Sequence, residues 1–215
     1  MKTITPLPIQ LGRNGDSLAI WLDNPASKNT VSSSNQVQTW KDYSGKGNDV
    51  TQATVSKRPL NNVKTKNGIT GLTFDGVNDE LRAATRIIDT PTDNMTLFVV
   101  CDMDGSSTSN VGVASQWGGV GSRDFALYSS TQLKYAAGFG PANFNFSEVP
   151  QEQPSLLMLQ YNAALGVNNS LFNIDGVNIT ISASTPRWNW GCFYSWRNTT
   201  WFWIWSLHNI RSYWI

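Results

Sequence analysis

Residues 170–179 read SLFNIDGVNI, two short apolar runs on either side of an Asp-Gly pair. Asp175 and Gly176 can both take positive φ, which the two central positions of a tight hairpin turn require. The flanking runs, Ser170–Ile174 and Val177–Ile181, alternate apolar and polar residues, the period of a strand with one face in water. This stretch therefore predicts a β-hairpin.

The same pattern recurs along the chain, and helical periodicity is nearly absent. Short apolar runs separated by Gly, Asn, Asp, Ser and Pro are typical of an all-β domain. The other predicted strands are Leu18–Leu22, Gln36–Asp42, Thr70–Phe74, Met95–Met103, Gly112–Gln116, Phe125–Ser129, Gln132–Gly138 and Ser155–Tyr161. Met95–Met103 is apolar at successive positions, so we expect it to be buried on both faces. Residues 139–154 are expected to be a long surface connection. We predict two packed antiparallel sheets in a single domain.

Length and charge exclude several classes of protein. The chain has 215 residues and a net charge of +1, with 14% charged residues, so no basic surface is expected to recruit nucleic acid. No stretch approaches the roughly 20 apolar residues of a membrane helix, and MKTITPLPIQLG at the start has no signal-peptide run. Cys101 and Cys192 are expected to be buried thiols, with a single bridge between them as the alternative.

The stretch DYSGKGND (42–49) is too rich in turn formers to be anything but a loop. Its carboxylate, hydroxyl and amide side chains can accept hydrogen bonds from backbone N–H groups, and its glycines supply positive φ. We predict a structural loop after a core tryptophan, with a ligand site as the alternative. The residues of this prediction are Trp40, Asp42, Ser44, Gly45, Gly47, Asn48 and Asp49.

The stretch FDGVNDEL offers a candidate calcium site. Asp75, Asn78 and Asp79 place three oxygen-bearing side chains within five residues, and calcium is bound by carboxylate and amide oxygens. The same spacing suits an ordinary turn, and Asp75-Gly76 is also a hairpin signal. A second such group is Asp102, Asp104 and Asn110.

Two kinds of enzyme find no support in the residues. The only histidine, His208, lies in the unusual C-terminal segment, so no Ser-His-Asp or Cys-His arrangement is indicated. The three glutamates are Glu80, Glu148 and Glu152, and their spacing does not give the carboxylate pair of a glycosidase. We therefore expect the protein not to be an enzyme.

The order of several motifs resembles a known superfamily. They are LAIWLDNPA (18–26), VQTWKDYSGKGNDVTQAT (37–54), RPLNN (58–62), NGITGLTFDGVNDEL (67–81), MTLFVVCDM (95–103), LLMLQYNA (156–163) and SLFNIDGVNI (170–179). Together they resemble the concanavalin A-like lectin/glucanase superfamily in its laminin-G-like subgroup. The resemblance implies a jelly-roll sandwich over residues 15–185 that binds carbohydrate or another surface, sometimes with calcium. The glucanase pattern E-x-D-x-E does not occur in this chain.

The best candidate for sugar binding is SQWGGVGSRDFALY (115–128). Two glycines follow Trp117, so its strand is ending and its ring could stack on a sugar at a loop edge. Arg123, Asp124 and Tyr128 are the polar and aromatic partners nearby. The alternative is that Trp117 caps the core of the sandwich.

The resemblance, with the lack of a secretion signal, leads to an expected function. We expect a non-enzymatic, lectin-like module of a phage virion (a tail fibre, head fibre or capsid decoration protein) that attaches to a surface polysaccharide. The alternatives are a structural decoration subunit without glycan binding, and a glycoside hydrolase or lyase. Partners would be a glycan or other virion proteins, with no nucleic acid and no membrane span. The expected location is the virion, or else a bacterial surface, and the oligomeric state is open.

The C-terminal segment departs from this pattern. Residues 188–215 hold seven of the ten tryptophans and contain no Asp or Glu. One interpretation is a native aromatic closing strand. The other is out-of-frame translation, because a one-base shift turns every TGG codon into one that begins with GG and encodes glycine. We therefore divide the chain into an arm (1–14), the laminin-G-like domain (15–185) and this segment (186–215), in which we place no binding residue.

Overall fold

The fold is given by a computed structural model of the chain. It describes residues 18–22, 30–31, 34–66, 69–75, 77–87, 95–101, 111–117, 123–129, 134–139, 142–148, 155–161, 171–179 and 182–183. Within these ranges, no helix has the length and hydropathy needed to cross a membrane. The chain divides into two compact units. The described residues of unit 1 fall in Met1–Leu72 and Glu80–Ile87, and those of unit 2 in Thr73–Asp79 and Ile88–Trp203.

Unit 1 is built from short strands around a tryptophan. Its four-stranded antiparallel sheet has the order β1 (Thr30–Val31), β2 (Val37–Trp40), β3 (Val50–Thr51) and β6 (Arg82–Ala83). A second pair consists of β4 (Leu60–Lys66) and β5 (Ile69–Thr73), and η2 (Val55–Lys57) is a 3₁₀ turn. Val37, Trp40 and Leu72 are almost completely buried. Trp40 is thus a core residue, as predicted.

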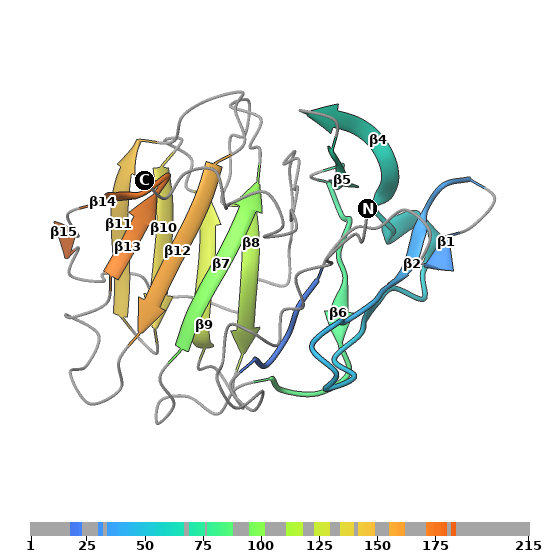
Figure 1. Cartoon of the computed structure of the whole chain (residues 1–215), viewed down its shortest axis with the longest axis horizontal. Helices are drawn as coiled ribbons and strands as arrows, with labels where there is room; N and C mark the ends of the chain where they lie inside the picture. Colours follow the sequence, from blue (N-terminus) through green and yellow to red (C-terminus); the bar gives the residue numbers. More distant parts are fainter. Residues whose placement is uncertain are drawn as a thin grey trace, which may run out of the picture. The chain divides into compact units, whose positions relative to one another are not determined.

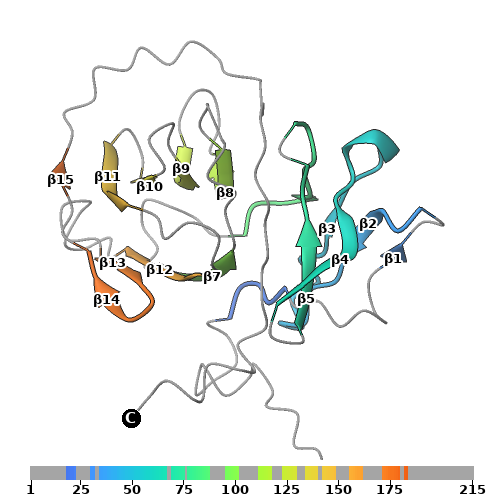
Figure 2. The same cartoon turned by 90° about the horizontal axis from the view of Figure 1, so that it is seen from above.

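Unit 2 contains two larger sheets, which Figures 1 and 2 show as two layers. One has the order β15 (Ser182–Ala183), β11 (Ala142–Glu148), β10 (Lys134–Phe139), β9 (Arg123–Ser129) and β8 (Val111–Trp117). The other has the order β14 (Val177–Asn178), β13 (Leu171–Ile174), β12 (Ser155–Tyr161) and β7 (Met95–Cys101). All the strand pairs within both sheets are antiparallel.

The core of unit 2 lies between these layers. Alternate residues of β7, β12 and β13 are buried, and Leu127 of β9 is buried in the opposite sheet. Among the described side chains of unit 2, the buried apolar residues are Val99, Cys101, Leu127, Leu157, Leu159, Phe172 and Ile174. A period of two with one buried face is the pattern of a sandwich sheet. The fold is therefore all-β and antiparallel, as predicted, whereas the jelly-roll connectivity and the single domain stay predictions.

The hairpin at SLFNIDGVNI is confirmed. Strand β13 pairs with β14, and Ile174 lies opposite Val177. The two residues between them, Asp175 and Gly176, have φ of 51° and 86°. Positive φ at both central positions defines the turn that suits a two-residue hairpin.

Three predictions about strands are wrong. Residues 139–154 contain a regular strand, β11, which pairs with β10 and β15. Strand β7 is not buried on both faces, because Phe98 is 45% exposed and β7 ends the order of its described sheet. Leu18–Leu22 forms only an isolated bridge from Leu22 to Asp42. In each case local composition did not predict how the strand pairs and packs, because these depend on its neighbours in the sheet.

Candidate functional site

The polar loop after β2 is held by two carboxylates. Asp42 Oδ1 accepts hydrogen bonds from the backbone N–H groups of Trp21 and Ser44, each at 2.9 Å. Asp42 Oδ2 accepts from the Ser44 hydroxyl at 2.7 Å and from the Asn48 N–H at 2.9 Å. Asp49 Oδ1 accepts the Asp42 N–H at 2.9 Å. Side-chain acceptors thus replace the missing strand ladder.

The electrostatics of the loop favour the ionised carboxylates. Burial would raise the pKa of Asp42, but the hydrogen bonds from Ser44, Trp21 and Asn48 together lower it below its ordinary 3.8. The hydrogen bond from Lys41 is the main cause that lowers the pKa of Asp49. Apart from the Trp21 N–H, the donors to both carboxylates come from residues 41–48, and the glycines at 45 and 47 have φ of 85° and 75°. These are the contacts that a structural loop needs, and the role itself stays a prediction.

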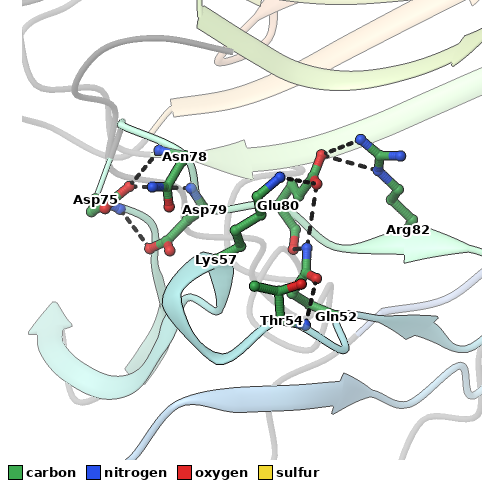
Figure 3. A network of polar contacts seen from close by, with 8 residues as sticks. All are labelled: Gln52, Thr54, Lys57, Asp75, Asn78, Asp79, Glu80 and Arg82. Carbon is green, nitrogen blue, oxygen red and sulfur yellow. Dashed lines mark hydrogen bonds and ion pairs between the residues drawn. The ribbon is translucent and has the colours of Figure 1, made fainter. Parts of the chain in front are cut away.

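The turn after β5 is closed by its own aspartates. Asp75 Oδ1 accepts from the N–H groups of Val77 at 2.8 Å, Asn78 at 3.1 Å and Asp79 at 3.2 Å. The Asp75 N–H donates in return to Asp79 Oδ2 at 2.9 Å, as Figure 3 shows. Strand β5 belongs with β4 rather than with the next strand, so the predicted Asp75-Gly76 hairpin is wrong. The segment is an Asx-type turn instead.

Donors of the turn itself already contact Asp75 Oδ1, one of the oxygens of the predicted calcium site. Three N–H donors converge on Asp75 Oδ1, and donors directed at a ligand oxygen oppose a cation there. Among the described parts of the chain there is no group of three or more His, Cys, Asp or Glu side chains that could hold a metal. The calcium site at Asp75, Asn78 and Asp79 stays a prediction, and the second group, Asp102, Asp104 and Asn110, lies outside the described residues.

The pKa of Asp79 predicts how pH affects stability. Burial is the largest cause that raises this pKa to about 6, and the Asp75 charge adds to it, whereas the Asp75 N–H opposes both. Between the ordinary value of 3.8 and about 6, the folded protein therefore holds a proton that the unfolded chain has lost. We expect this carboxyl to make the protein less stable as pH rises through that window, and Asp79→Asn to remove the effect.

Urea unfolding of wild type and Asp79→Asn across this pH range would test the expectation. The variant should gain stability relative to wild type as pH rises toward neutrality, with a plateau above about 6. The difference between the two proteins cancels the other titrating groups. A difference that does not change with pH would contradict the raised pKa.

Strand register separates the residues predicted to bind sugar. Trp117 at the end of β8 lies opposite Arg123 at the start of β9. The pairing then skips Asp124, so two residues of β9 face one of β8, which is a β-bulge. Tyr128 lies opposite Gly112, five residues away from Arg123 and so about 17 Å along the strand. Trp117, Arg123 and Asp124 therefore share one end of the sheet, and Tyr128 does not.

A second candidate lies on the outer face of the four-stranded sheet of unit 2, on the side away from the core. It contains Phe98 of β7, which lies opposite Met158 of β12 in register. We call this surface the Phe98 face and define it by Thr96, Phe98, Val100, Leu156, Met158, Gln160, Leu171, Asn173 and Asn178. Phe98 and Leu171 are 45% and 49% exposed, so the face presents apolar surface to solvent.

Two pairs of polar side chains lie beside this apolar surface, one on β7 and β12 and the other on β13 and β14. Gln160 Nε2 donates to Thr96 Oγ1 over a long 3.5 Å, and Asn173 Nδ2 donates to Asn178 Oδ1 at 3.1 Å. Asn173 Oδ1 also accepts the Gly176 N–H at 2.8 Å. An aromatic ring beside oriented amides is the combination with which proteins hold a ligand that has both apolar and hydroxyl surface.

Sequence reasoning missed the Phe98 face. It treated MTLFVVCDM as a strand with two buried faces, because every position from Leu97 to Val100 is apolar. The available signal was in the partner strands, where polar Gln160 and Asn173 occur at alternate positions to buried Leu159 and Phe172. Alternation in a neighbouring strand reveals which face is wet even when one strand is apolar throughout.

The glutamates considered for catalysis have different positions. Glu80 bonds to its neighbours: its Oε2 accepts from Arg82 at 2.7 Å, and its Oε1 lies 3.7 Å from Lys57 Nζ (Figure 3). Gln52 Nε2 donates to the same Oε1 at 3.3 Å. Glu148 ends β11, and Glu152 lies outside the described residues. Glu80 therefore forms ion pairs with Lys57 and Arg82 in unit 1.

Comparison with known proteins gives structural neighbours only. No family model and no curated protein sequence matches the chain. A mutant of Trypanosoma rangeli sialidase displaying trans-sialidase activity aligns with 91% of the chain at 14% identity and a TM-score of 0.49. The same sialidase in complex with the inhibitor DANA aligns with 82% at 15% identity, also at 0.49. Its complex with sialic acid aligns with 86% at 14% identity and 0.44. The chain covers 32%, 26% and 26% of those structures.

These neighbours correct one expectation. The prediction that the chain is not an enzyme is contradicted, because the solved structures to which it is similar are sialidases and trans-sialidases, which are enzymes. The prediction rested on two patterns, the Ser-His-Asp or Cys-His arrangement and the carboxylate pair of a glycosidase. The absence of these patterns does not exclude other catalytic chemistry. A fold does not by itself transfer an activity, so the likeness gives this chain no sialidase function. These neighbours are not virion proteins, and the phage expectation gains no support from them.

Proposed function

We propose that the chain binds carbohydrate through the Phe98 face of unit 2. One observation carries the proposal, namely a half-exposed aromatic ring on a sheet face that also carries an amide–hydroxyl pair, Gln160 with Thr96, and an amide pair, Asn173 with Asn178. A sugar ring has an apolar side of C–H groups and an equator of hydroxyls. The face of Phe98 can pack against the first, and the amides of Gln160 and Asn178 can bond to the second.

The end of the β8–β9 pair is a second part of the proposal. Trp117 opposite Arg123, with Asp124 in the bulge, is where the sequence predicted sugar binding. Bulges occur often beside functional sites because they redirect a side chain. We propose these three residues as a separate contact, without Tyr128, which register places at the other end of the strand.

A finer assignment rests on the sequence resemblance. We propose that the sandwich is laminin-G-like and that it attaches a virion to a surface glycan. Peptides of this chain in purified virus particles would support that location. Their presence in a bacterial envelope fraction, with none in particles, would contradict it and leave carbohydrate binding unaffected.

A binding screen tests the proposed function. The full chain should bind in a saturable manner to at least one immobilised oligosaccharide, and Phe98→Tyr should retain binding because the ring remains. Phe98→Ala should weaken binding at least about tenfold, since loss of a well-packed aromatic contact costs about 1.4 kcal/mol or more. Val55→Ala, at a residue 53% exposed in unit 1, is the matched control and should bind as wild type. Absence of saturable binding to every carbohydrate would refute the proposal.

A further inference from the structure

We infer that the ligand of the Phe98 face is an uncharged, extended oligosaccharide that lies across the strands. The inference rests on the proposed function and narrows its ligand. Two independent features of the described residues carry it, the absence of charge on the face and the direction in which its aromatic and amide groups are arranged.

Charge comes first. None of the nine residues that define the Phe98 face is Lys, Arg, Asp or Glu. Asp175, in the β13–β14 turn, uses its Oδ1 to accept the Leu156 N–H at 2.7 Å. A carboxylated or sulfated sugar bound here would lose hydration without gaining a cation in return, which is costly. Anion recognition in proteins relies on Arg, Lys or clustered N–H donors, so this face suits a neutral sugar.

The second feature is the direction of the row of aromatic and amide groups, which runs across the strands. Phe98, Met158, Asn173 and Asn178 are successive register partners on β7, β12, β13 and β14. Neighbouring strands are about 4.8 Å apart, so the row spans about 14 Å from the ring to the last amide. That is longer than one sugar ring, and a chain of sugars lying across the strands would meet the ring first and the amides next. Along β7 itself, Phe98 has only Thr96 and Val100 on the same face.

The polar groups along this row retain bonding capacity. Asn173 is committed at both ends of its amide, to Asn178 Oδ1 and to the Gly176 N–H. It therefore fixes the orientation of Asn178. No contact described for this face uses Asn178 Nδ2 or Gln160 Oε1. One donor and one acceptor are thus left for hydroxyls, which both donate and accept.

Titration with chosen sugars tests the inference. The probes are neutral hexasaccharides of glucose, galactose and mannose, the matching disaccharides, and sialyllactose as the anionic probe. We expect at least one neutral hexasaccharide to bind at least about tenfold more tightly than sialyllactose. Asn178→Ala should weaken that hexasaccharide several-fold and leave the disaccharide unchanged, because the disaccharide does not reach β14. Phe98→Ala should weaken both.

The outcomes separate the inference from the proposed function. If sialyllactose binds best and its binding is lost at high salt, the inference is overturned while carbohydrate binding stands. If Trp117→Ala abolishes binding and Phe98→Ala does not, the site is at the β8–β9 end and the inference again fails. If no probe binds, the inference fails, and if the wider screen also finds no carbohydrate that binds, the proposed function falls as well. Self-association in sedimentation velocity that Phe98→Ala removes would show that a second copy occupies the face.

Discussion

Phe172→Ala should lower the free energy of unfolding of unit 2 by about 3–5 kcal/mol, the usual cost of removing a buried phenyl ring. Phe172 is 1% exposed and is among the largest buried side chains of the described residues. It lies on β13 opposite Leu159 of β12, and both point to the core between the two sheets. Truncation leaves a cavity there, since sheets packed against each other cannot close a ring-sized gap without losing other contacts.

Phe98→Ala is the matched control for this prediction. It removes the same atoms from another strand of the same sheet, but from the outer face, where the ring is 45% exposed. We expect it to cost only about 1 kcal/mol. Hydrogen exchange followed by mass spectrometry would report each effect locally, as faster exchange in peptides that cover β7, β12 and β13. Equal losses in the two variants would mean that the assignment of inner and outer faces is wrong.

The same pair of residues shows how far sequence reasoning could go. Alternation and turn chemistry predicted most strands of unit 2, and β12 (Ser155–Tyr161) is found with the predicted bounds. Alternation gives a period, and a period identifies two faces. It does not say which face is wet when both are apolar, as in β7. That depends on the partner strands, because exposed Phe98 lies opposite Met158 of β12, and Met158 in turn lies opposite polar Asn173 of β13.

Strand β11 was predicted as a loop for a similar reason. Residues 142–148 read ANFNFSE, a period-two pattern, but Pro141 and the surrounding Gly and Asn favoured a loop. What decides the matter is the pairing of β11 with β10 on one side and β15 on the other. Long-range pairing overrides local propensity in sheets. The candidate site was harder still, because Phe98, Gln160 and Asn178 come together only through register.

The polar loop was accessible to sequence reasoning because its chemistry is local. Asp42, Ser44 and Asn48 lie within seven residues, and glycines lie between them. What the sequence could not show is the distant partner, Trp21, whose N–H donates to Asp42 Oδ1 across 21 positions. The loop thus also holds residues 18–22 in place, together with the hydrogen bond from Asn48 Nδ2 to the Ala19 carbonyl at 2.8 Å.

Asp42→Ala should therefore destabilise unit 1 by about 2–4 kcal/mol. The substitution leaves three backbone N–H groups and one hydroxyl without their acceptor, and hydrogen bonds to a charged group contribute about 1.5–3 kcal/mol each when partly buried, less where water can replace them. Ser44→Ala removes one donor to Asp42 and should cost about 1 kcal/mol. Both losses should appear as faster hydrogen exchange in peptides that cover residues 18–22 and 40–50.

The pH dependence of the stability lost in Asp42→Ala shows whether Asp42 acts as a charged hydrogen-bond acceptor or only by packing. The pKa of Asp42 is lower in the folded protein than its ordinary 3.8, so its stabilising effect is complete above that value. It is lost as pH falls through the lowered pKa, because the folded state must then take up a proton that weakens the acceptor. The difference between wild type and Asp42→Ala should therefore be largest near neutrality and shrink in acid. If the difference in stability between wild type and Asp42→Ala is the same at neutral and at acidic pH, Asp42 acts by filling space and its charge does not hold the loop.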